Sequence, residues 1–432
     1  MAGDRIDPWA SDTYDYGRLI EQFGIEPFDL DRFPLPDPPA PFRRGVVFGH
    51  RGFPSVHRAI SAGTPFAVLT GLAPSGRMHF GHKMVLDQIL AYHRWGADVF
   101  VAVADLEAWG ARGVPIDESR RIAVEEYILN YIALGLPSER TQIYWQSDRK
   151  EVEDLAFVLS RAVNWSTVRA IYGFNDDTNM AHIQAPMVQM GDILHVQLDD
   201  HGGPQPTIVP VGVDQDPHIR LVRDIARSYR WYSVQETDGR TGVFLKGDRP
   251  IEDLDAAGDT LSSAGHAVEM NRPYRALYTD LDVDRTEDLM LALEHSRGAY
   301  GFYAPAATYH MLMTALTGGK MSSSDPDSAI FLSDDPEDAV RKLRAAVTGG
   351  RTTAEEQREM GGEPDICSVF EMLRFHLLDD DSELERVRRE CLDGARLCGR
   401  CKGEAADLLR TFLEGLRERR GSARDVLDDY LA

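Results

Sequence analysis

Two histidines stand three residues apart in the segment TGLAPSGRMHFGH, residues 70–82, between an apolar run and a stretch with helical spacing. A strand, a Gly/Pro/Ser turn and a helix start form an anion site, because unpaired backbone N–H groups and the positive end of the helix dipole face the incoming group. The glycine between the histidines would let a flat base or a sugar approach the backbone. The pattern predicts a nucleotide site made of Pro74, Ser75, Gly76, His79, Gly81 and His82. Ordinary surface or core histidines remain an alternative for so short a motif.

A second segment with chemical potential is GGKMSSSDPDSAIFL at 318–332. A Gly-Gly hinge that carries one lysine and three hydroxyls is suited to closing over a polyphosphate. Lys320, beside Met321, would supply a point charge, while Ser322 and Ser323 would supply hydrogen-bond donors. Only six of the 47 basic residues are lysines, so a lysine at this place favours a task that needs an ammonium group.

All four cysteines lie near the C-terminus, with the spacing C-x23-C-x6-C-x2-C: Cys367, Cys391, Cys398 and Cys401. In a cytoplasmic protein such clustering indicates a metal rather than disulfides. Four thiolates could bind tetrahedral zinc or an iron–sulfur cluster. The alternative is that they are small buried side chains on amphipathic helices.

Short apolar runs alternate with helical segments between residues 66 and 212. FAVLTG at 66–71, ADVFVAVAD at 97–105, TQIYWQ at 141–146 and TIVPVG at 207–212 read as strands. This alternation predicts an α/β fold with a Rossmann-like, doubly wound parallel sheet, which binds ligands at the carboxyl ends of its strands. Asp214 and Gln215 directly follow the last of these runs and therefore occupy such a position.

The remaining segments suggest the domain organisation. Residues 1–65 are rich in Pro, Asp and Phe and look like an appended, partly irregular segment. A catalytic domain then covers 66–332 and is interrupted by an acidic, turn-rich insertion at 233–300. Residues 333–432 show amphipathic helical segments alone, which predicts a helical C-terminal domain.

The composition limits the class of protein. The 432 residues include 70 acidic and 47 basic ones, for a net charge of -23, which is untypical of a nucleic-acid binder. An acidic, lysine-poor chain suits a halophilic cytoplasm, where salt screens self-repulsion, while a GC-rich genome would explain only the preference for arginine. No apolar run reaches the roughly 18 residues of a membrane span, and the N-terminus lacks signal-peptide features, so we expect a cytoplasmic protein without membrane contact.

One part of the chain departs from this acidic balance. Residues 383–424 contain eleven basic residues and eight acidic ones, a local excess that would suit contacts to an RNA backbone. A solvated helix face with i,i+4 ion pairs is the alternative.

The HFGH and KMSSS segments, about 240 residues apart on an α/β pattern, resemble the HIGH and KMSKS signatures of class I aminoacyl-tRNA synthetases. VGVDQDPHIRLVRDIA at 211–226, KMSSSDPDSAIFL and TGGRTTAEEQREMGG at 348–362 narrow the resemblance to tryptophanyl-tRNA synthetases of the archaeal and eukaryotic type. It covers about residues 64–230 and 303–430.

This resemblance implies ATP-dependent activation of L-tryptophan, with Mg²⁺, and its transfer to tRNA(Trp) by a homodimer whose helical domain binds the anticodon. His79, His82 and Lys320 would stabilise charge on the phosphates, and His82 and Asp214 would hold the adenosine. Glu107 and Gln215 would receive the substrate's ammonium group, and Gln184 would face its indole. Without the resemblance, Glu107 would read as a solvated helix-end residue and Gln184 as a loop amide. Some tryptophanyl-tRNA synthetases also carry a four-iron four-sulfur cluster on cysteines spaced almost as they are here.

Two positions depart from the family pattern. Leu69 stands where eukaryotic tryptophan enzymes have tyrosine, and Ala102 stands where they have glutamine. Tyrosyl-tRNA synthetase, which shares the fold and the signatures, therefore remains an alternative. A non-catalytic paralogue that acts as a tRNA-binding module is a further one, although such a module has no need of both signatures.

Overall fold

A seven-stranded sheet forms the centre of the molecule in a computed structural model that describes residues 16, 20, 23–74, 76–319 and 325–431. Five strands are parallel. Four of them correspond to the predicted apolar runs, and the fifth is a further segment that was not predicted. They are β3 (Ala67–Leu72), β4 (Asp98–Val103), β5 (Thr141–Trp145), β6 (Thr207–Gly212) and β11 (Ala306–His310). The predicted α/β fold with a Rossmann-like sheet is thereby confirmed.

The order of the strands places a ligand site. The sheet runs β1-β2-β11-β6-β3-β4-β5, so the chain moves outward from β3 to β5 and then returns to β6 on the other side of β3. In doubly wound sheets a crevice opens at this reversal point. Here β3 and β6 pair only at Ala67 with Thr207 and at Val68 with Ile208, after which the two strands separate.

The N-terminal segment contributes to the same sheet. Strand β2 (Val47–Arg51) is antiparallel to β11 and also pairs with β1 (Glu26–Pro27), while α2 (Ala40–Arg43) and α3 (Phe53–Ala62) pack beside them. The expectation of an appended segment over 1–65 is therefore wrong for its described part. Strand β2 was hard to predict because its sequence, VFGHR, has no regular apolar pattern. The glycine within it, Gly49, is required by close packing, since a Cβ there would come within 2.5 Å of Ile25.

Helices cover both faces of the sheet, and each face has its own core. One core contains side chains of α3, α4 (Phe80–Arg94), the continuous helical segment of α6 (Ile116–Ile122), η1 (Ala123–Ile128) and α7 (Leu129–Ala133), and the C-terminal helices. The other contains side chains of α8 (Lys150–Ser160), α9 (Trp165–Tyr172), α10 (Met180–His195) and α11 (Asp216–Ser228).

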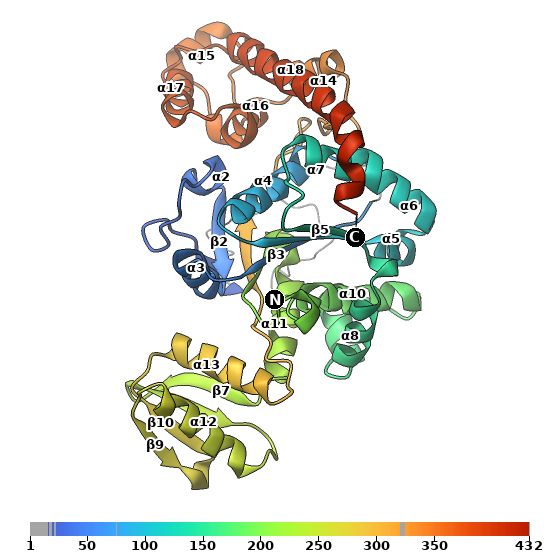
Figure 1. Cartoon of the computed structure of the whole chain (residues 1–432). Coiled ribbons are helices and arrows are strands. Elements are labelled where there is room, and N and C mark those ends of the chain that lie inside the picture. Colours follow the sequence, from blue (N-terminus) through green and yellow to red (C-terminus); the bar gives the residue numbers. More distant parts are fainter. Residues whose placement is uncertain (1–15, 17–19, 21–22, 75, 320–324, 432) are drawn as a thin grey trace.

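The predicted insertion is a folded unit with a separate core. A four-stranded antiparallel sheet in the order β7-β8-β10-β9 packs against two helices, and its core includes Tyr232, Leu254 and Leu277. The elements are β7 (Tyr232–Thr237), β8 (Arg240–Leu245), α12 (Ile251–Ser263), β9 (Val268–Asn271), β10 (Ala276–Thr279) and α13 (Val283–Ser296). In Figure 1 this unit and the C-terminal helices lie on opposite sides of the central sheet.

The C-terminal region is helical, as predicted. It comprises α14 (Pro336–Ala345), α15 (Ala354–Met360), α16 (Ser368–Met372), η7 (Leu373–Leu377), α17 (Asp381–Leu392) and the 26-residue α18 (Cys398–Ala423). Helix α18 packs along α14 and α7 and so connects this region to the central sheet. No helix in the described part of the chain is both long and apolar enough to cross a membrane.

Candidate active site

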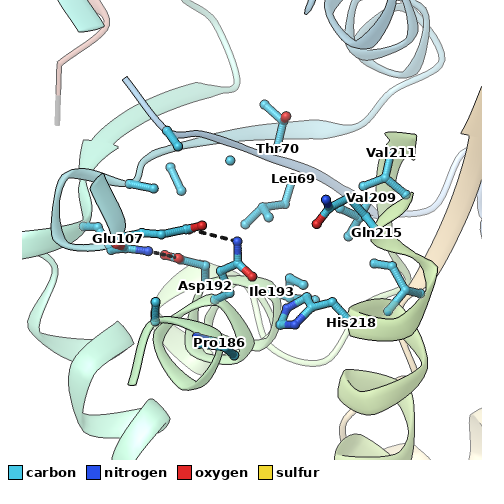
Figure 2. Close-up of a pocket in the computed structure, with 18 of the residues that line it drawn as sticks. Leu69, Thr70, Glu107, Pro186, Asp192, Ile193, Val209, Val211, Gln215 and His218 are labelled. Carbon is cyan, nitrogen blue, oxygen red and sulfur yellow. Dashed lines mark hydrogen bonds between the residues drawn. The ribbon is translucent and has the colours of Figure 1, made fainter. Parts of the chain in front are cut away.

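A cavity of about 300 Å³ opens where β3 and β6 separate (Figure 2). Its walls are largely apolar and include Leu69 of β3, Val209 of β6 and Ile193 of α10. Polar side chains enter it from several elements, with Glu107 and Gln215 approaching from opposite sides in Figure 2. A mostly apolar cavity with a few convergent polar groups is typical of a small-molecule site.

Glu107 is one of two acidic groups at this cavity. It lies in the first turn of α5 (Asp105–Arg112), directly after β4. Burial raises the pKa of its carboxyl, while nearby Arg112 and a hydrogen bond from Gln189 oppose the rise. The bond from Gln189 Nε2 to Glu107 Oε2 is 2.9 Å long. A carboxylate held in this way can bind an ammonium group.

The structure corrects the expectation for Gln184. This side chain is exposed on α10 and does not line the cavity, whereas Gln189 of the same helix does. Five residues along an α-helix correspond to a rotation of about 140°, so the two glutamines point in very different directions. The residues of α10 that line the cavity, at positions 182, 185, 186, 189, 192 and 193, follow helical spacing, and this phase is the signal that would have selected Gln189.

Asp192 is a second buried carboxyl at the cavity. This residue was not predicted from the sequence. It accepts hydrogen bonds from the Tyr144 hydroxyl at 2.8 Å and from Gln146 Nε2 at 2.5 Å. Burial raises the pKa of Asp192 to about 7. The other amide atom of Gln146, Oε1, is buried without a hydrogen-bond partner among the described residues, and Gln146 lines the cavity. An unpaired buried acceptor of this kind is costly unless a ligand donor reaches it.

A tyrosine–histidine pair also borders the cavity. The Tyr172 hydroxyl lies 2.5 Å from Nδ1 of His218, and burial lowers the pKa of this histidine to about 4. The imidazole is therefore neutral near pH 7. With Nδ1 accepting the hydroxyl proton, Nε2 carries the ring hydrogen.

The two positions that depart from the family pattern, Leu69 and Ala102, both line the cavity and are almost completely buried. They present only apolar atoms. The polar groups at the cavity come instead from α5, α9, α10, α11 and the end of β5, and from Thr70 of β3.

The two histidines of HFGH form the start of helix α4. Nδ1 of His79 accepts the Gly81 N–H at 3.1 Å, and Nδ1 of His82 accepts the His79 N–H at 3.1 Å. The ring centres lie 3.9 Å apart, and the two ring planes are tilted by 30°. A Cβ at Gly81 would come within 2.9 Å of the His79 ring, so this glycine makes room for the imidazole. The expected contact of Gly81 with a nucleotide stays a prediction.

Burial lowers the pKa of His79 to about 2 and that of His82 to about 4. Both rings are therefore neutral near pH 7. Because each Nδ1 accepts a backbone N–H, each neutral ring must carry its hydrogen on Nε2. The motif thus provides two oriented N–H donors rather than two positive charges.

The segment after KMSSS lies directly against HFGH. The Leu332 N–H donates to the Met78 carbonyl at 2.8 Å, and Phe331 forms an isolated β-bridge with His79. The Arg77 guanidinium stacks 4.5 Å from the Phe331 ring centre and lies 2.8 Å from the Asp334 carboxylate. Two motifs about 240 residues apart in sequence are adjacent in the fold.

The remaining predicted nucleotide-site residues are only partly described by the structure. Ser75, Lys320, Met321, Ser322 and Ser323 lie outside the described residues. Pro74 is buried and Gly76 is half-buried in the turn between β3 and α4. Asp214, next to Gln215 after β6, is half-buried and accepts a hydrogen bond from Gln215 Nε2 at 3.4 Å.

The four cysteines come together from three helix ends. Cys367 precedes α16, Cys391 lies in the last turn of α17, and Cys398 and Cys401 lie in the first turn of α18. All four line one small cavity together with Arg396 and Lys402. Across the described residues, however, no three His, Cys, Asp or Glu side chains have the arrangement of a metal site.

Most basic side chains of residues 383–424 are engaged within the chain. Arg386, Arg389, Arg396, Arg400 and Arg410 form ion pairs with nearby carboxylates, while Lys402, Arg419 and Arg420 donate to backbone carbonyls. This arrangement matches the alternative of a helix surface with intramolecular ion pairs.

Fold and motifs together define a class I aminoacyl-tRNA synthetase. A family model described as tRNA synthetases class I (W and Y) matches residues 61–249 and 283–414, and the chain belongs to this family. A relative from Thermoplasma volcanium, named tryptophan--tRNA ligase, is 44% identical and the match covers 99% of each chain. Tryptophan--tRNA ligase 1 of Halobacterium salinarum is 40% identical, with 98% of this chain and 94% of the relative covered. A crystal structure of tryptophanyl-tRNA synthetase from Aeropyrum pernix K1 superposes with a TM-score of 0.75 at 39% identity, covering 97% of this chain and 96% of that one.

Proposed function

We propose that the chain is a tryptophan–tRNA ligase, which activates L-tryptophan with ATP and then transfers it to tRNA(Trp). The observation that carries this function is the apolar cavity at the sheet reversal point, in a chain with tryptophan–tRNA ligase relatives over its whole length. Phosphate chemistry would take place at the start of α4. As a translation enzyme it would act in the cytoplasm.

In the first step, a carboxylate oxygen of tryptophan attacks the α-phosphorus of ATP, which enters as its magnesium complex. The bond from this phosphorus to the bridging oxygen breaks, and pyrophosphate leaves with that electron pair. In the second step, a hydroxyl of the terminal tRNA ribose attacks the carbonyl carbon of the adenylate. The bond from this carbon to the phosphate oxygen breaks, AMP leaves with that electron pair, and the hydroxyl proton is released to water or to the AMP phosphate. Catalysis of such transfers consists mainly of alignment and of stabilising charge on the phosphate oxygens.

The amino acid would bind in the cavity with its ammonium group between Glu107 and Gln215. Gln189, which is hydrogen-bonded to Glu107, belongs to the same end of the cavity. The indole N–H needs an acceptor, and Oε1 of Gln146 is a buried amide oxygen without a partner among the described residues. Asp192 would hold this amide in place from its other side.

The ATP phosphates would lie against the start of α4, with Nε2–H of His79 and of His82 as donors. Lys320 would neutralise the leaving pyrophosphate, with Ser322 and Ser323 as further donors. Asp214 would face the adenosine. Neutral donors fit this task, because they stabilise the charge that develops without any need for a proton change at pH 7.

Tryptophan-dependent ATP–pyrophosphate exchange, with tyrosine as the parallel substrate, tests this function without tRNA. We expect exchange with tryptophan and not with tyrosine, and loss of exchange in Lys320→Ala. Exchange with tyrosine alone would show that Leu69 and Ala102 mark a tyrosine site. No exchange with either amino acid, in a folded protein that binds tRNA, would favour the non-catalytic paralogue.

We also propose that the enzyme is a homodimer joined through α5, α8, α9 and α10. Large apolar side chains gather on these helices: Phe157 is 85% exposed, Met180 67% and Trp109 52%. Where such groups form one continuous patch of several hundred Å², the patch is typical of an interaction surface rather than of a monomer. Light scattering should give twice the chain mass for the natural sequence and a monomer for Phe157→Asp, while the same change at an exposed polar site such as Ser296 should leave the dimer intact.

For the four cysteines we propose a structural metal centre, an iron–sulfur cluster ahead of zinc. Burial raises the pKa of Cys401 to about 12 and raises that of Cys391, so these two thiols are neutral without a cation. Arg396 and Lys402 beside them would offset the negative charge of four thiolates. When bound, the centre would tie the ends of α16, α17 and α18 together.

Anaerobic purification followed by absorption spectroscopy and metal analysis tests this proposal. A broad absorption band in the visible range, together with four iron atoms per chain, would identify an iron–sulfur cluster. A colourless protein with one zinc ion per chain would identify a zinc site. Cys398→Ser should lose the metal and lower the unfolding temperature. A metal-free protein whose four thiols all react with a thiol reagent would refute the proposal.

A further inference from the structure

A second concave site with an unusual charge lies on the other side of the fold from the cavity described above. It is a cavity of about 240 Å³ between strand β2 and helix α11. Four arginines, Arg51, Arg220, Arg223 and Arg227, line it together with two carboxylates, Glu26 and Asp224, so positive charge is in excess there although the chain as a whole carries a net charge of -23. Several neighbouring guanidinium groups in so acidic a protein indicate a site that binds an anion.

Three of these arginines are on one face of α11, because positions 220, 223 and 227 follow helical spacing. The fourth, Arg51, ends β2 and pairs with Ala307 near the amino end of β11. Ligands of the catalytic cavity enter at the carboxyl ends of the parallel strands. The arginine site is therefore separate from that cavity.

Arg223 is the group with the least compensation. Its Nη1 donates to the Pro305 carbonyl at 2.6 Å, and no carboxylate in the described part of the chain pairs with it. Its guanidinium packs on the backbone of Gly52, where a Cβ would come within 2.4 Å of Nη1 and where φ is +64°. Burial, with contributions from Arg227 and Arg51, lowers the pKa of Arg223 to about 10, so the group stays charged at pH 7.

A second source of positive potential meets these side chains. Gly52 is the N-cap residue of α3, a helix of ten residues, and no side chain caps this end. The guanidinium group of Arg223 lies against the positive end of α3, and an anion bound beside both groups would offset this contact between like charges. The cavity has room for a small polyatomic anion, since one water occupies roughly 30 Å³.

The other three arginines are only partly neutralised. Arg51 and Arg220 share the single carboxylate of Asp216, at 2.5 Å and 3.2 Å. Arg227 is 3.9 Å from Asp224, and this pair is exposed to solvent. Planar guanidinium groups bind phosphate oxygens in pairs, which makes arginine well suited to phosphate recognition.

We propose that this cavity is a second anion site, which binds a phosphate group as free phosphate or pyrophosphate. A cavity of this volume has room for a small anion, which meets the local charge of the arginines rather than the net charge of the chain. Although the two sites are separate, one residue, Asp216, links the arginines to the turn that borders the catalytic cavity. Asp216 holds Arg51 and Arg220, and it directly follows Gln215 at the start of α11. An anion that draws the two arginines away from Asp216 would therefore act on the turn that carries Gln215.

Calorimetric titration of the full chain with inorganic phosphate, and separately with pyrophosphate, tests the proposal. Saturating ATP without amino acid occupies the catalytic phosphate site throughout. We expect one remaining binding event, which Arg223→Gln weakens at least tenfold and Arg223→Lys weakens less. Arg285→Gln, an exposed arginine of the insertion, serves as the matched control and should bind like the natural protein.

Equal binding by the natural protein and Arg223→Gln would overturn the proposal, and so would the absence of any binding event under ATP saturation. If Arg223→Gln does not fold, Arg220→Gln and Arg227→Gln take its place, and unchanged affinity in both would overturn it equally. Filter binding of a tRNA(Trp) transcript separates the two sources of phosphate. A loss of tRNA affinity in Arg223→Gln without any phosphate binding would replace the free anion with an RNA backbone.

Discussion

Protonation at the candidate active site is set by burial more than by residue type. The two histidines of HFGH are neutral donors, because their rings are desolvated and their Nδ1 atoms accept backbone N–H groups. Burial also favours the neutral form of Glu107, but for a carboxylic acid this form is the protonated one, so its pKa is raised instead of lowered. The charge at this site therefore depends on which partners arrive, and a substrate ammonium group would keep Glu107 ionised.

The two glutamines of α10 give a matched pair of variants. Gln189→Ala removes an amide that contacts Glu107 at the cavity, so KM for tryptophan should rise about tenfold, as expected for one lost hydrogen bond to a charged group. Gln184→Ala changes the same residue type on the same helix at an exposed position and should leave KM unchanged. Pyrophosphate exchange measures both. An effect of Gln184→Ala as large as that of Gln189→Ala would contradict the placement.

The pKa of Glu107 predicts a pH dependence for amino-acid binding. A raised pKa means that the carboxyl gains a proton at a higher pH than an exposed glutamate does, and a neutral acid binds ammonium poorly. KM for tryptophan should therefore rise as the pH falls through this pKa, while kcat changes less. Glu107→Gln should have a high KM that does not depend on pH over the same range. A pH profile of Glu107→Gln that matches the natural enzyme would contradict this role.

At the scale of elements, the catalytic parts meet because of two local features. The pairing of β3 with β6 stops after two residue pairs, and this opens the cavity. The bridge between His79 and Phe331 then fixes where the segment after KMSSS lies relative to the start of α4. Both features depend on backbone hydrogen bonds, for which many side chains are compatible.

Arg77 is the side chain that fastens this second contact, through its ion pair with Asp334 and its stacking on Phe331. Arg77→Ala should lower kcat of pyrophosphate exchange several-fold, because the segment after KMSSS would be less well aligned, while KM for tryptophan stays constant. A double-mutant cycle with Asp334→Asn should give a coupling of about 0.5–1 kcal/mol, since the arginine is partly exposed. Arg121→Ala, which breaks an exposed ion pair on α6, is the control. Equal loss of kcat in both variants would contradict the alignment role.

At the scale of the whole molecule, the insertion is the part most independent of the rest. Its core is separate from the two cores around the central sheet. The chain enters and leaves it near Tyr229 and Tyr300, whose ring centres are 5.9 Å apart. The buried arginine at its entrance, Arg230, pairs with Glu287 and Glu294 of the insertion itself.

Removal of residues 230–299 and closure with two glycines should therefore leave a folded enzyme. Arg230 must be removed together with its partners, because a buried guanidinium without them would cost several kcal/mol. We expect pyrophosphate exchange within about threefold of the full chain, because the cavity and both motifs stay intact. Deletion of 231–299 alone, which retains Arg230, is the paired control and should unfold at a lower temperature. Loss of exchange in the first variant with a normal unfolding temperature would assign the insertion a part in catalysis.

The sequence alone predicted four of the five parallel strands, the helical C-terminal region and the family, because buried parallel strands read as apolar runs and the two signatures have characteristic residues. It did not show that β2 joins the central sheet, since a strand that contains Gly, His and Arg has no apolar pattern. Nor did it select Gln189 over Gln184, because that choice depends on the rotation of a helix about its axis. Only the tertiary structure brought four arginines from two segments to one cavity and four cysteines from three helix ends to another. Convergence of this kind depends on how elements pack across the sheet, which local sequence patterns do not encode.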